Sequence, residues 1–169
     1  MNHAQHASPH DLGLFVVACG LVTAPASKAS NLDLVNGASC QLSIPTTATG
    51  VRPKASGFRN ESTTTSSFVI CTMSRSTTTG EYSQVGLIGY SLDGAAHAVT
   101  CTAVAGNTLA PKYSSKTASI RDATELPFIW SAADFGGSGD DPINGSLYFS
   151  ITCNLPPQTA ISYIQALTP

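Results

Sequence analysis

Apolar and polar residues alternate along much of this chain, and the alternation is clearest over residues 146–155. One set of alternate positions there is apolar and comprises Leu147, Phe149, Ile151, Cys153 and Leu155. The residues between them carry mostly hydroxyl or amide groups. A period of two predicts a half-buried antiparallel strand whose apolar set faces a core. The same pattern directs Cys153 inward.

Shorter or less regular versions of this pattern recur. They predict further strands at residues 41–44, 67–73, 82–92, 97–104, 118–120, 127–131 and 162–167. Residues 67–73 are apolar on both faces, which is typical of a central strand, and Asp93-Gly94 predicts a hairpin turn between two of the segments. No amphipathic helix of convincing length follows residue 30. About eight short strands therefore favour an all-β fold, an antiparallel β-sandwich of the Ig-like or jelly-roll-like kind.

The beginning of the chain has a different pattern. Residues 12–24 form one apolar run, too short to span a bilayer comfortably and typical of the core of a signal peptide. Small residues follow the run, and we favour cleavage after Ala29 over cleavage after Ala26. We therefore predict a leader at residues 1–29 and a single domain at residues 30–169.

Two alternatives to a cleaved leader remain open. No Lys or Arg precedes the apolar run, where export signals normally carry positive charge, and His3, His6 and His10 stand there instead. On that view the segment is a buried N-terminal helix or strand. The residues around Cys19 also resemble a bacterial lipobox, in which Cys19 would be lipidated and would anchor the protein to the outer membrane. We expect membrane contact only in that case.

Charge is scarce in this sequence. Charged residues make up 11% of the chain, against a usual share of about 25%. Ser, Thr, Gly, Ala and Asn take their place, which suits the solvent side of exported strands better than the charged faces of a helical bundle. The formal net charge is −2, and the Lys and Arg residues after the leader are scattered along the sequence. Counterion release would add little affinity, so we expect no nucleic-acid binding.

Four cysteines follow the predicted leader, Cys40, Cys71, Cys101 and Cys153. An even count in an exported chain predicts two disulfides. After the predicted leader, neither a Cys-x-x-Cys pair nor a histidine other than His97 is present to suggest zinc. Three pairings satisfy the count. We favour Cys40–Cys71 with Cys101–Cys153, because the other pairings join more distant segments at a higher closure cost. These loops would add roughly 3.7 and 4.2 kcal/mol to stability.

Several features together resemble a known group of proteins. They are Cys40, residues 68–71 with Arg75, residues 99–101, Tyr148, residues 153–157 and residues 161–164. Spread over most of residues 36–167, they look like the framework of uncharacterised exported four-cysteine β-sandwich proteins of proteobacteria. In that group a Pro often follows the second cysteine, where this chain has Thr72. The resemblance implies a secreted or periplasmic β-sandwich and no particular activity.

Residues that could carry catalysis are few. Ser91, Asp93 and His97 come nearest to a hydrolase triad, but all three fall on one predicted hairpin, where a base rarely contacts both of its partners. Residues 134–136 spell the Asp-Phe-Gly motif of kinases, and nothing else of a kinase accompanies them. We therefore expect no enzyme activity, no catalytic residue and no cofactor.

Two binding chemistries remain. Asp134, Asp140 and Asp141 lie in or beside a Gly-rich loop and are candidate calcium ligands, although their spacing does not fit an EF-hand and turn-forming Asp is the plainer interpretation. Exposed aromatic side chains can stack on sugar rings, although Tyr is also common in strands. The candidates for stacking are Tyr82, Tyr90, Tyr113, Trp130, Tyr148 and Tyr163.

These patterns favour an exported, non-enzymatic binding or structural module in the secreted or periplasmic space, with an unidentified protein or glycan partner. A carbohydrate- or calcium-binding β-sandwich domain is the alternative. A secreted hydrolase ranks below both.

Overall fold

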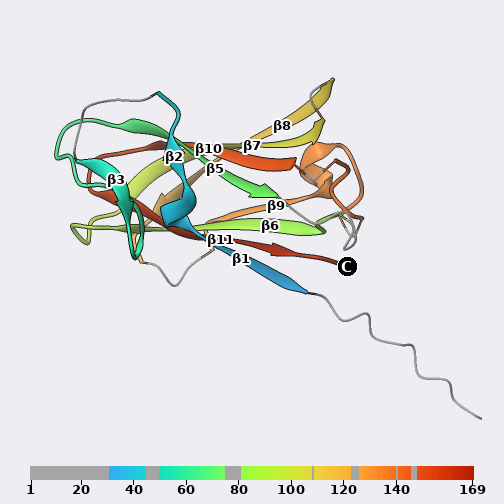
Figure 1. Cartoon of the computed structure of the whole chain (residues 1–169), viewed down its shortest axis with the longest axis horizontal. Coiled ribbons are helices and arrows are strands. Elements are labelled where there is room, and N and C mark those ends of the chain that lie inside the picture. The colour runs from blue at the N-terminus through green and yellow to red at the C-terminus, as the bar shows by residue number, and fades with distance from the viewer. Residues whose placement is uncertain are drawn as a thin grey trace, which may run out of the picture.

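Two antiparallel β-sheets pack face to face in the computed structural model, as Figure 1 shows. The structure describes residues 31–44, 50–74, 81–107, 109–122, 126–139, 141–145 and 148–169. The predicted leader, including Cys19, lies outside this part of the chain, and so does Asp140. Within it no helix is long and apolar enough to cross a membrane. The helices found there are two short 3-10 helices, η1 (Gly37–Ser39) and η2 (Ala132–Phe135).

One sheet has six strands. They are β1 (Leu32–Asn36), β3 (Val51–Lys54), β4 (Gly57–Asn60), β6 (Gln84–Ser91), β9 (Phe128–Ser131) and β11 (Thr159–Leu167). Their order is β3-β4-β11-β6-β9, and β1 also pairs with β11. β4 pairs with the first residues of β11 and β1 with the last, while β6 pairs along the strand. β1 and β4 therefore share one edge of β11.

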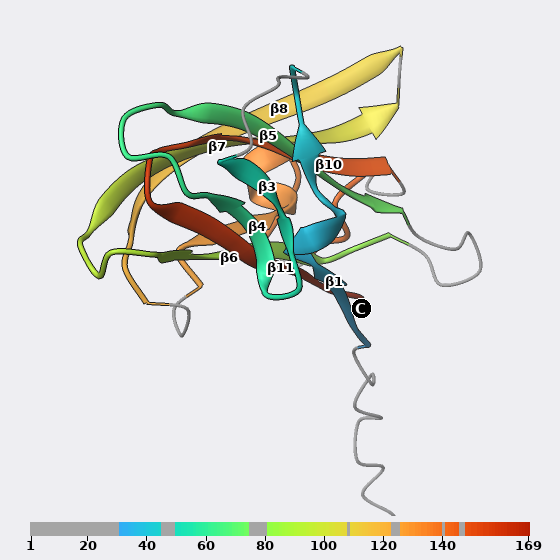
Figure 2. The ribbon, with the colours of Figure 1, turned by 60° about the vertical axis from the view of Figure 1, so that its left-hand side comes forward.

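The other sheet has five strands. They are β2 (Gln41–Leu42), β5 (Ser67–Ser74), β7 (His97–Asn107), β8 (Ala110–Ile120) and β10 (Tyr148–Leu155). Their order is β2-β5-β10-β7-β8. β7 and β8 pair along their whole length as a hairpin, and Figure 2 shows this hairpin extending beyond the rest of its sheet.

The predicted all-β antiparallel sandwich is confirmed, with eleven strands in place of about eight. The alternation of apolar residues predicts none of β1, β3 and β4, which are at most five residues long. β3 includes Pro53, which a strand at the edge of a sheet tolerates. β8 begins at Ala110 and not at residue 118, because most of it is an exposed, polar edge strand. Partner strands supply the hydrogen bonds that hold such segments extended.

The core lies between the sheets and is rich in aromatic rings. Phe149 points inward from β10 as its alternation predicts, and it is 1% exposed. Its ring packs against Trp130 and edge-on against Phe135, with centroid distances of 6.5 and 5.9 Å. Trp130 also stacks on Phe128, and its indole nitrogen donates a hydrogen bond to the Ser114 carbonyl. The ring cluster thus joins β9, η2 and β10.

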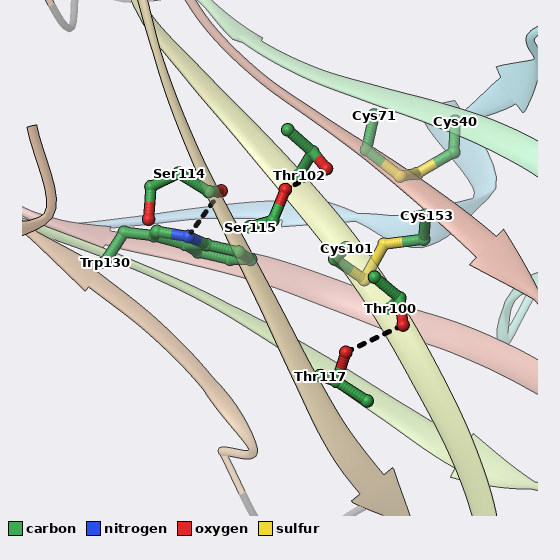
Figure 3. Close-up of a disulfide and its surroundings, with 10 residues drawn as sticks. All are labelled: Cys40, Cys71, Thr100, Cys101, Thr102, Ser114, Ser115, Thr117, Trp130 and Cys153. Atoms are coloured by element: carbon green, nitrogen blue, oxygen red, sulfur yellow. Dashed lines mark hydrogen bonds between the residues drawn. A yellow bond between two sulfur atoms is a disulfide. The ribbon is translucent and has the colours of Figure 1, made fainter.

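Both favoured disulfides, Cys40–Cys71 and Cys101–Cys153, are confirmed. Cys101 lies directly opposite Cys153 on β7 and β10, and Cys40 comes just before β2, which pairs with β5 beside Cys71. Both bonds therefore cross-link neighbouring strands of the five-stranded sheet on its core side, as Figure 3 shows for the second pair. Because disulfides persist in oxidising surroundings, they indicate a compartment outside the reducing cytosol.

The predicted hairpin at Asp93-Gly94 is wrong. The turn is present, and Gly94 adopts the left-handed conformation with φ +77°, but the strands on either side of it belong to different sheets. β6 pairs with β9 and β11, whereas β7 pairs with β8 and β10. The turn therefore carries the chain from one sheet to the other. Local turn chemistry identified the reversal, and partners distant in sequence decided the pairing.

Candidate functional site

The outer surface of the five-stranded sheet has an unusual composition. On its strands the residues that alternate with the core positions point away from the core. We call this side the hydroxyl face. Its residues include Gln41, Phe68, Ile70, Thr72, Ser74, Ala98, Thr100, Thr102, Val104, Tyr113, Ser115, Thr117, Ser119, Tyr148, Ser150, Thr152 and Asn154. None of these side chains is charged.

Rows of hydroxyl groups cross the hydroxyl face from strand to strand. Thr100 on β7 lies opposite Thr117 on β8, and Thr102 lies opposite Ser115. The paired hydroxyls share hydrogen bonds of 2.8 and 2.6 Å, which Figure 3 shows. Such cross-strand pairs stabilise a sheet by roughly 0.2–1 kcal/mol each. They also hold the hydroxyl groups in fixed positions on the solvent side.

Three aromatic rings stand exposed on the same face. Phe68, Tyr113 and Tyr148 are 53%, 65% and 74% exposed. Tyr113 lies opposite Val104, Val104 lies opposite Ser150, and Tyr148 comes two residues before Ser150. The two tyrosines therefore stand at the same end of the face, on strands separated by roughly 10 Å, since neighbouring strands are about 4.8 Å apart. Rings held on rigid strands can pack against apolar ligand surfaces.

The other candidates for stacking lie elsewhere. Trp130 and Tyr82 are buried in the core, Tyr90 contacts Arg59 on the six-stranded sheet, and Tyr163 is half-buried on β11. Phe68 was not among the predicted candidates, because the apolar run around it predicts a central strand. β5 does lie between β2 and β10, but its outer side faces solvent.

Ser91, Asp93 and His97 do come together, although not as a triad. The Ser91 hydroxyl donates to Asp93 Oδ1 at 2.7 Å, and His97 Nε2 lies 2.9 Å from the same oxygen. The backbone N–H of Ala95 donates to it as well. A triad needs the base between nucleophile and acid, whereas here the carboxylate lies between Ser91 and His97. The arrangement holds the turn between β6 and β7.

The contacts of Asp93 in this turn should make its contribution to folding stability depend on pH. The Ser91 hydroxyl, followed by His97, holds the pKa of Asp93 far below its ordinary value of 3.8. As the pH falls, Asp93 is protonated in the unfolded chain before it is protonated in the folded protein. The contribution of Asp93 to the free energy of unfolding is therefore complete above pH 3.8, and it is lost as the pH falls toward the pKa of the folded state. We expect the urea midpoint of the wild type to fall more steeply below about pH 4 than that of Asp93→Asn. Parallel pH profiles of the two proteins would contradict this assignment.

The calcium candidates are partly engaged in holding the fold. Asp134 forms an ion pair with Lys116 at 2.8 Å and accepts the Ser131 N–H with its other oxygen. Asp141 accepts the N–H of Ser138 within a turn, and it lines a cavity of about 280 Å³ together with Glu81. No three His, Cys, Asp or Glu residues gather as a metal site within the described ranges. Calcium binding stays a prediction, and Asp140 lies outside those ranges.

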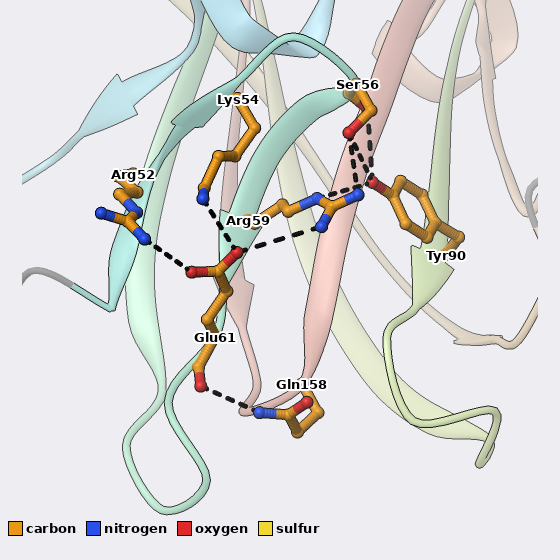
Figure 4. Close-up of polar contacts among 7 residues, drawn as sticks. All are labelled: Arg52, Lys54, Ser56, Arg59, Glu61, Tyr90 and Gln158. Carbon is orange, nitrogen blue, oxygen red and sulfur yellow. Dashed lines mark hydrogen bonds and ion pairs between the residues drawn. The ribbon is translucent and has the colours of Figure 1, made fainter.

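Sequence reasoning overlooked one charged cluster. Arg52, Lys54 and Arg59 surround Glu61 at the β3–β4 hairpin, with the phenol of Tyr90 alongside, as Figure 4 shows. Three of the Lys and Arg residues are therefore clustered, in contrast to the scatter expected along the sequence. The available signal was local, since all three cations fall within residues 52–59.

The structure thus offers three arrangements of polar groups, the uncharged hydroxyl face, the turn around Asp93 and the cationic β3–β4 hairpin. Among the described residues, no Ser or Thr hydroxyl in these arrangements hydrogen-bonds to the His97 ring, and the Ser91 hydroxyl bonds to the Asp93 carboxylate. Comparisons of this chain with protein-family models, curated proteins and solved structures each gave no match.

Proposed function

We propose that the protein is an exported, non-enzymatic binding module that holds its partner on the hydroxyl face. Export is supported by the two disulfides, which belong to an oxidising compartment, and by the predicted leader. The proposed location is secreted or periplasmic. If Cys19 is lipidated, the module is instead an outer-membrane lipoprotein.

The observation that carries this proposal is the composition of the hydroxyl face. Charged residues make up about 25% of an average protein, whereas the residues named on this face carry hydroxyl groups, amides and three exposed rings, and none of them is charged. Charge depletion and exposed tyrosines are characteristic of surfaces that bind partners. The hydroxyl rows would add directional hydrogen bonds, and the fixed strands would lower the entropy cost of binding.

Carbohydrate binding is the second candidate function, and one observation favours it. Tyr113 and Tyr148 are exposed at the same end of the hydroxyl face, next to hydroxyl-bearing residues of β7 and β8. A sugar ring has an apolar side that packs on aromatic rings and a rim of hydroxyls that exchange hydrogen bonds with Ser, Thr and Asn. The face supplies both kinds of contact.

We expect the double substitution Tyr113→Ala with Tyr148→Ala to weaken binding of the captured partner by roughly tenfold or more, since each ring contributes about 0.5–1.5 kcal/mol. A glycan array and partner pull-downs with purified protein supply the ligand, and titration measures the affinity. Leu32→Ala with Leu34→Ala is the matched control, because these side chains are similarly exposed on the other sheet.

Two outcomes would contradict the proposal. One is an equal loss of affinity in both double variants, which would show that the partner does not bind through the hydroxyl face. The other is robust turnover on a hydrolase panel that disappears in Ser91→Ala or His97→Ala.

A further inference from the structure

The β3–β4 hairpin carries more positive charge than its single carboxylate neutralises. Arg52 and Arg59 lie directly opposite each other on the two strands, an arrangement of like charges that destabilises a sheet. Glu61 Oε2 lies 3.2 Å from Arg52, and its Oε1 lies 3.4 Å from Lys54 and 3.9 Å from Arg59. Three cations against one anion leave a formal excess of two positive charges, on a chain whose net charge is −2.

The three cations differ in how far the fold uses them. Arg59 is committed, since its Nε donates to the Tyr90 hydroxyl at 3.1 Å and its Nη2 to Ser56 at 2.8 Å. Its guanidinium also lies 5.8 Å from the centre of the Tyr90 ring. Among the described residues, the side chains of Arg52 and Lys54 form ion pairs only with Glu61, and they are 50% and 37% exposed. They present unused donors to solvent beside a rigidly held Arg59.

Glu61 keeps its charge, so the excess does not vary near neutral pH. Burial alone would raise the pKa of this carboxyl, but the hydrogen bonds and charges of Arg52 and Lys54 outweigh burial and place the pKa below its ordinary value of 4.5. The carboxylate therefore stays ionised. It holds Arg52 and Lys54 side by side at a fixed edge of the sheet.

We propose that the β3–β4 hairpin is an anion-binding site, and that its ligand is the carboxylate or sulfate groups of an acidic polysaccharide. Guanidinium groups match such groups with paired hydrogen bonds. Membrane binding is disfavoured, because it typically uses about four to eight clustered cations and no large exposed hydrophobic residue lies within the hairpin's described residues. An acidic peptide would also find no large exposed aliphatic side chain among these residues. The Ser56 hydroxyl, which accepts from Arg59 and Tyr90, keeps a proton that it can donate to a sugar oxygen.

Affinity of the purified full chain for dextran sulfate and polygalacturonate, with neutral dextran as the uncharged reference, tests the site. Both acidic polymers should bind and neutral dextran should not, and binding should weaken about tenfold or more between 20 and 200 mM salt. Arg52→Gln with Lys54→Gln should weaken binding about tenfold. Glu61→Gln should strengthen it, because the excess charge rises.

The matched control is Lys112→Gln with Arg121→Gln, which removes the same charge away from the hairpin and should change affinity by less than about twofold. Equal weakening in the two double variants would overturn the proposal, as would binding of neutral dextran. Tighter binding to polyglutamate or to phosphatidylglycerol vesicles would also overturn it. The β3–β4 hairpin and the two tyrosines Tyr113 and Tyr148 belong to different sheets. The anion site and the hydroxyl face are therefore tested by different variants, and either proposal can fail without the other.

Discussion

Replacing Cys101 and Cys153 by Ala is expected to lower the free energy of unfolding by about 4 kcal/mol. The bond spans 52 residues and joins opposite positions of two central strands. Without it the unfolded chain gains conformations that the native fold must outcompete. Because domains of this kind are stable by only about 5–15 kcal/mol, the loss is a large fraction of the total. The shift in urea midpoint can be followed by the fluorescence of Trp130, the single tryptophan.

The shorter bond and a neighbouring surface pair supply the comparisons. Cys40→Ala with Cys71→Ala opens a span of 31 residues, for which the same entropy estimate is roughly 3.7 kcal/mol. Thr102→Ala with Ser115→Ala removes a cross-strand contact on the solvent side of the same sheet and should cost less than about 1 kcal/mol. If the cysteine variants unfold at the same urea concentration as the wild type, the disulfides do not stabilise the protein by lowering the conformational entropy of the unfolded chain.

Phe149→Ala is expected to destabilise the protein by about 3–5 kcal/mol. The ring is almost fully buried and contacts both Trp130 and Phe135. Its removal loses the transfer free energy of a phenyl group and leaves a cavity between the sheets, which the rigid strands fill only in part. Thermal and urea unfolding of the oxidised protein give the change in free energy.

Tyr148→Ala is the internal control, since Tyr148 is the preceding residue and is 74% exposed. Substitution there should alter stability by less than about 0.5 kcal/mol. Similar losses for the two variants would mean that the alternation along β10 does not separate core from surface. The same substitution removes one ring of the hydroxyl face, so an unchanged stability also validates it as a binding variant.

The strands that could be predicted are those whose two sides meet different surroundings. β10 alternates between buried and exposed positions along its whole length, and its inward set matches the predicted one over the described residues. Cys153 belongs to that set, and the disulfide to Cys101 lies in the core as expected. A strand with one side in the core and the other in water has apolar residues at every second position. This pattern can be recognised in the sequence without knowing which strands pair with it.

Two of the strands that were not predicted, β1 and β4, depend on a distant partner. β1 pairs with β11, the last strand of the chain, so that residues 32–36 lie opposite residues 163–167. β4 pairs with the first residues of β11, about a hundred residues later. β3 pairs with its neighbour β4, and it was missed because it is short, charged and without apolar alternation. The Asp93-Gly94 turn does not form a hairpin because β6 pairs with β9 and β11, far along the chain, while β7 pairs with its sequence neighbour β8 and with β10.

The candidate sites show the same division. Alternation placed Tyr148 on the outer side of β10, but it could not place Tyr113 beside it, since that depends on the order β10-β7-β8. The cationic hairpin required Arg52 and Arg59 to face each other across β3 and β4. The three cations are close together in the sequence, but their residue types alone do not predict a β3–β4 hairpin that sets Arg52 opposite Arg59.

By itself, the amino-acid sequence determined the all-β class and the inward side of the long strands, because these follow from local periodicity. It favoured the observed pairing of the four cysteines through the closure cost of loops, and the structure established that pairing. The tertiary structure alone decided which strands share a sheet, that Ser91 and His97 both bind Asp93 rather than each other, and which polar groups gather on each outer face. The physical reason is that strand pairing is a competition among distant segments for backbone hydrogen bonds and buried area, and no single segment records its outcome.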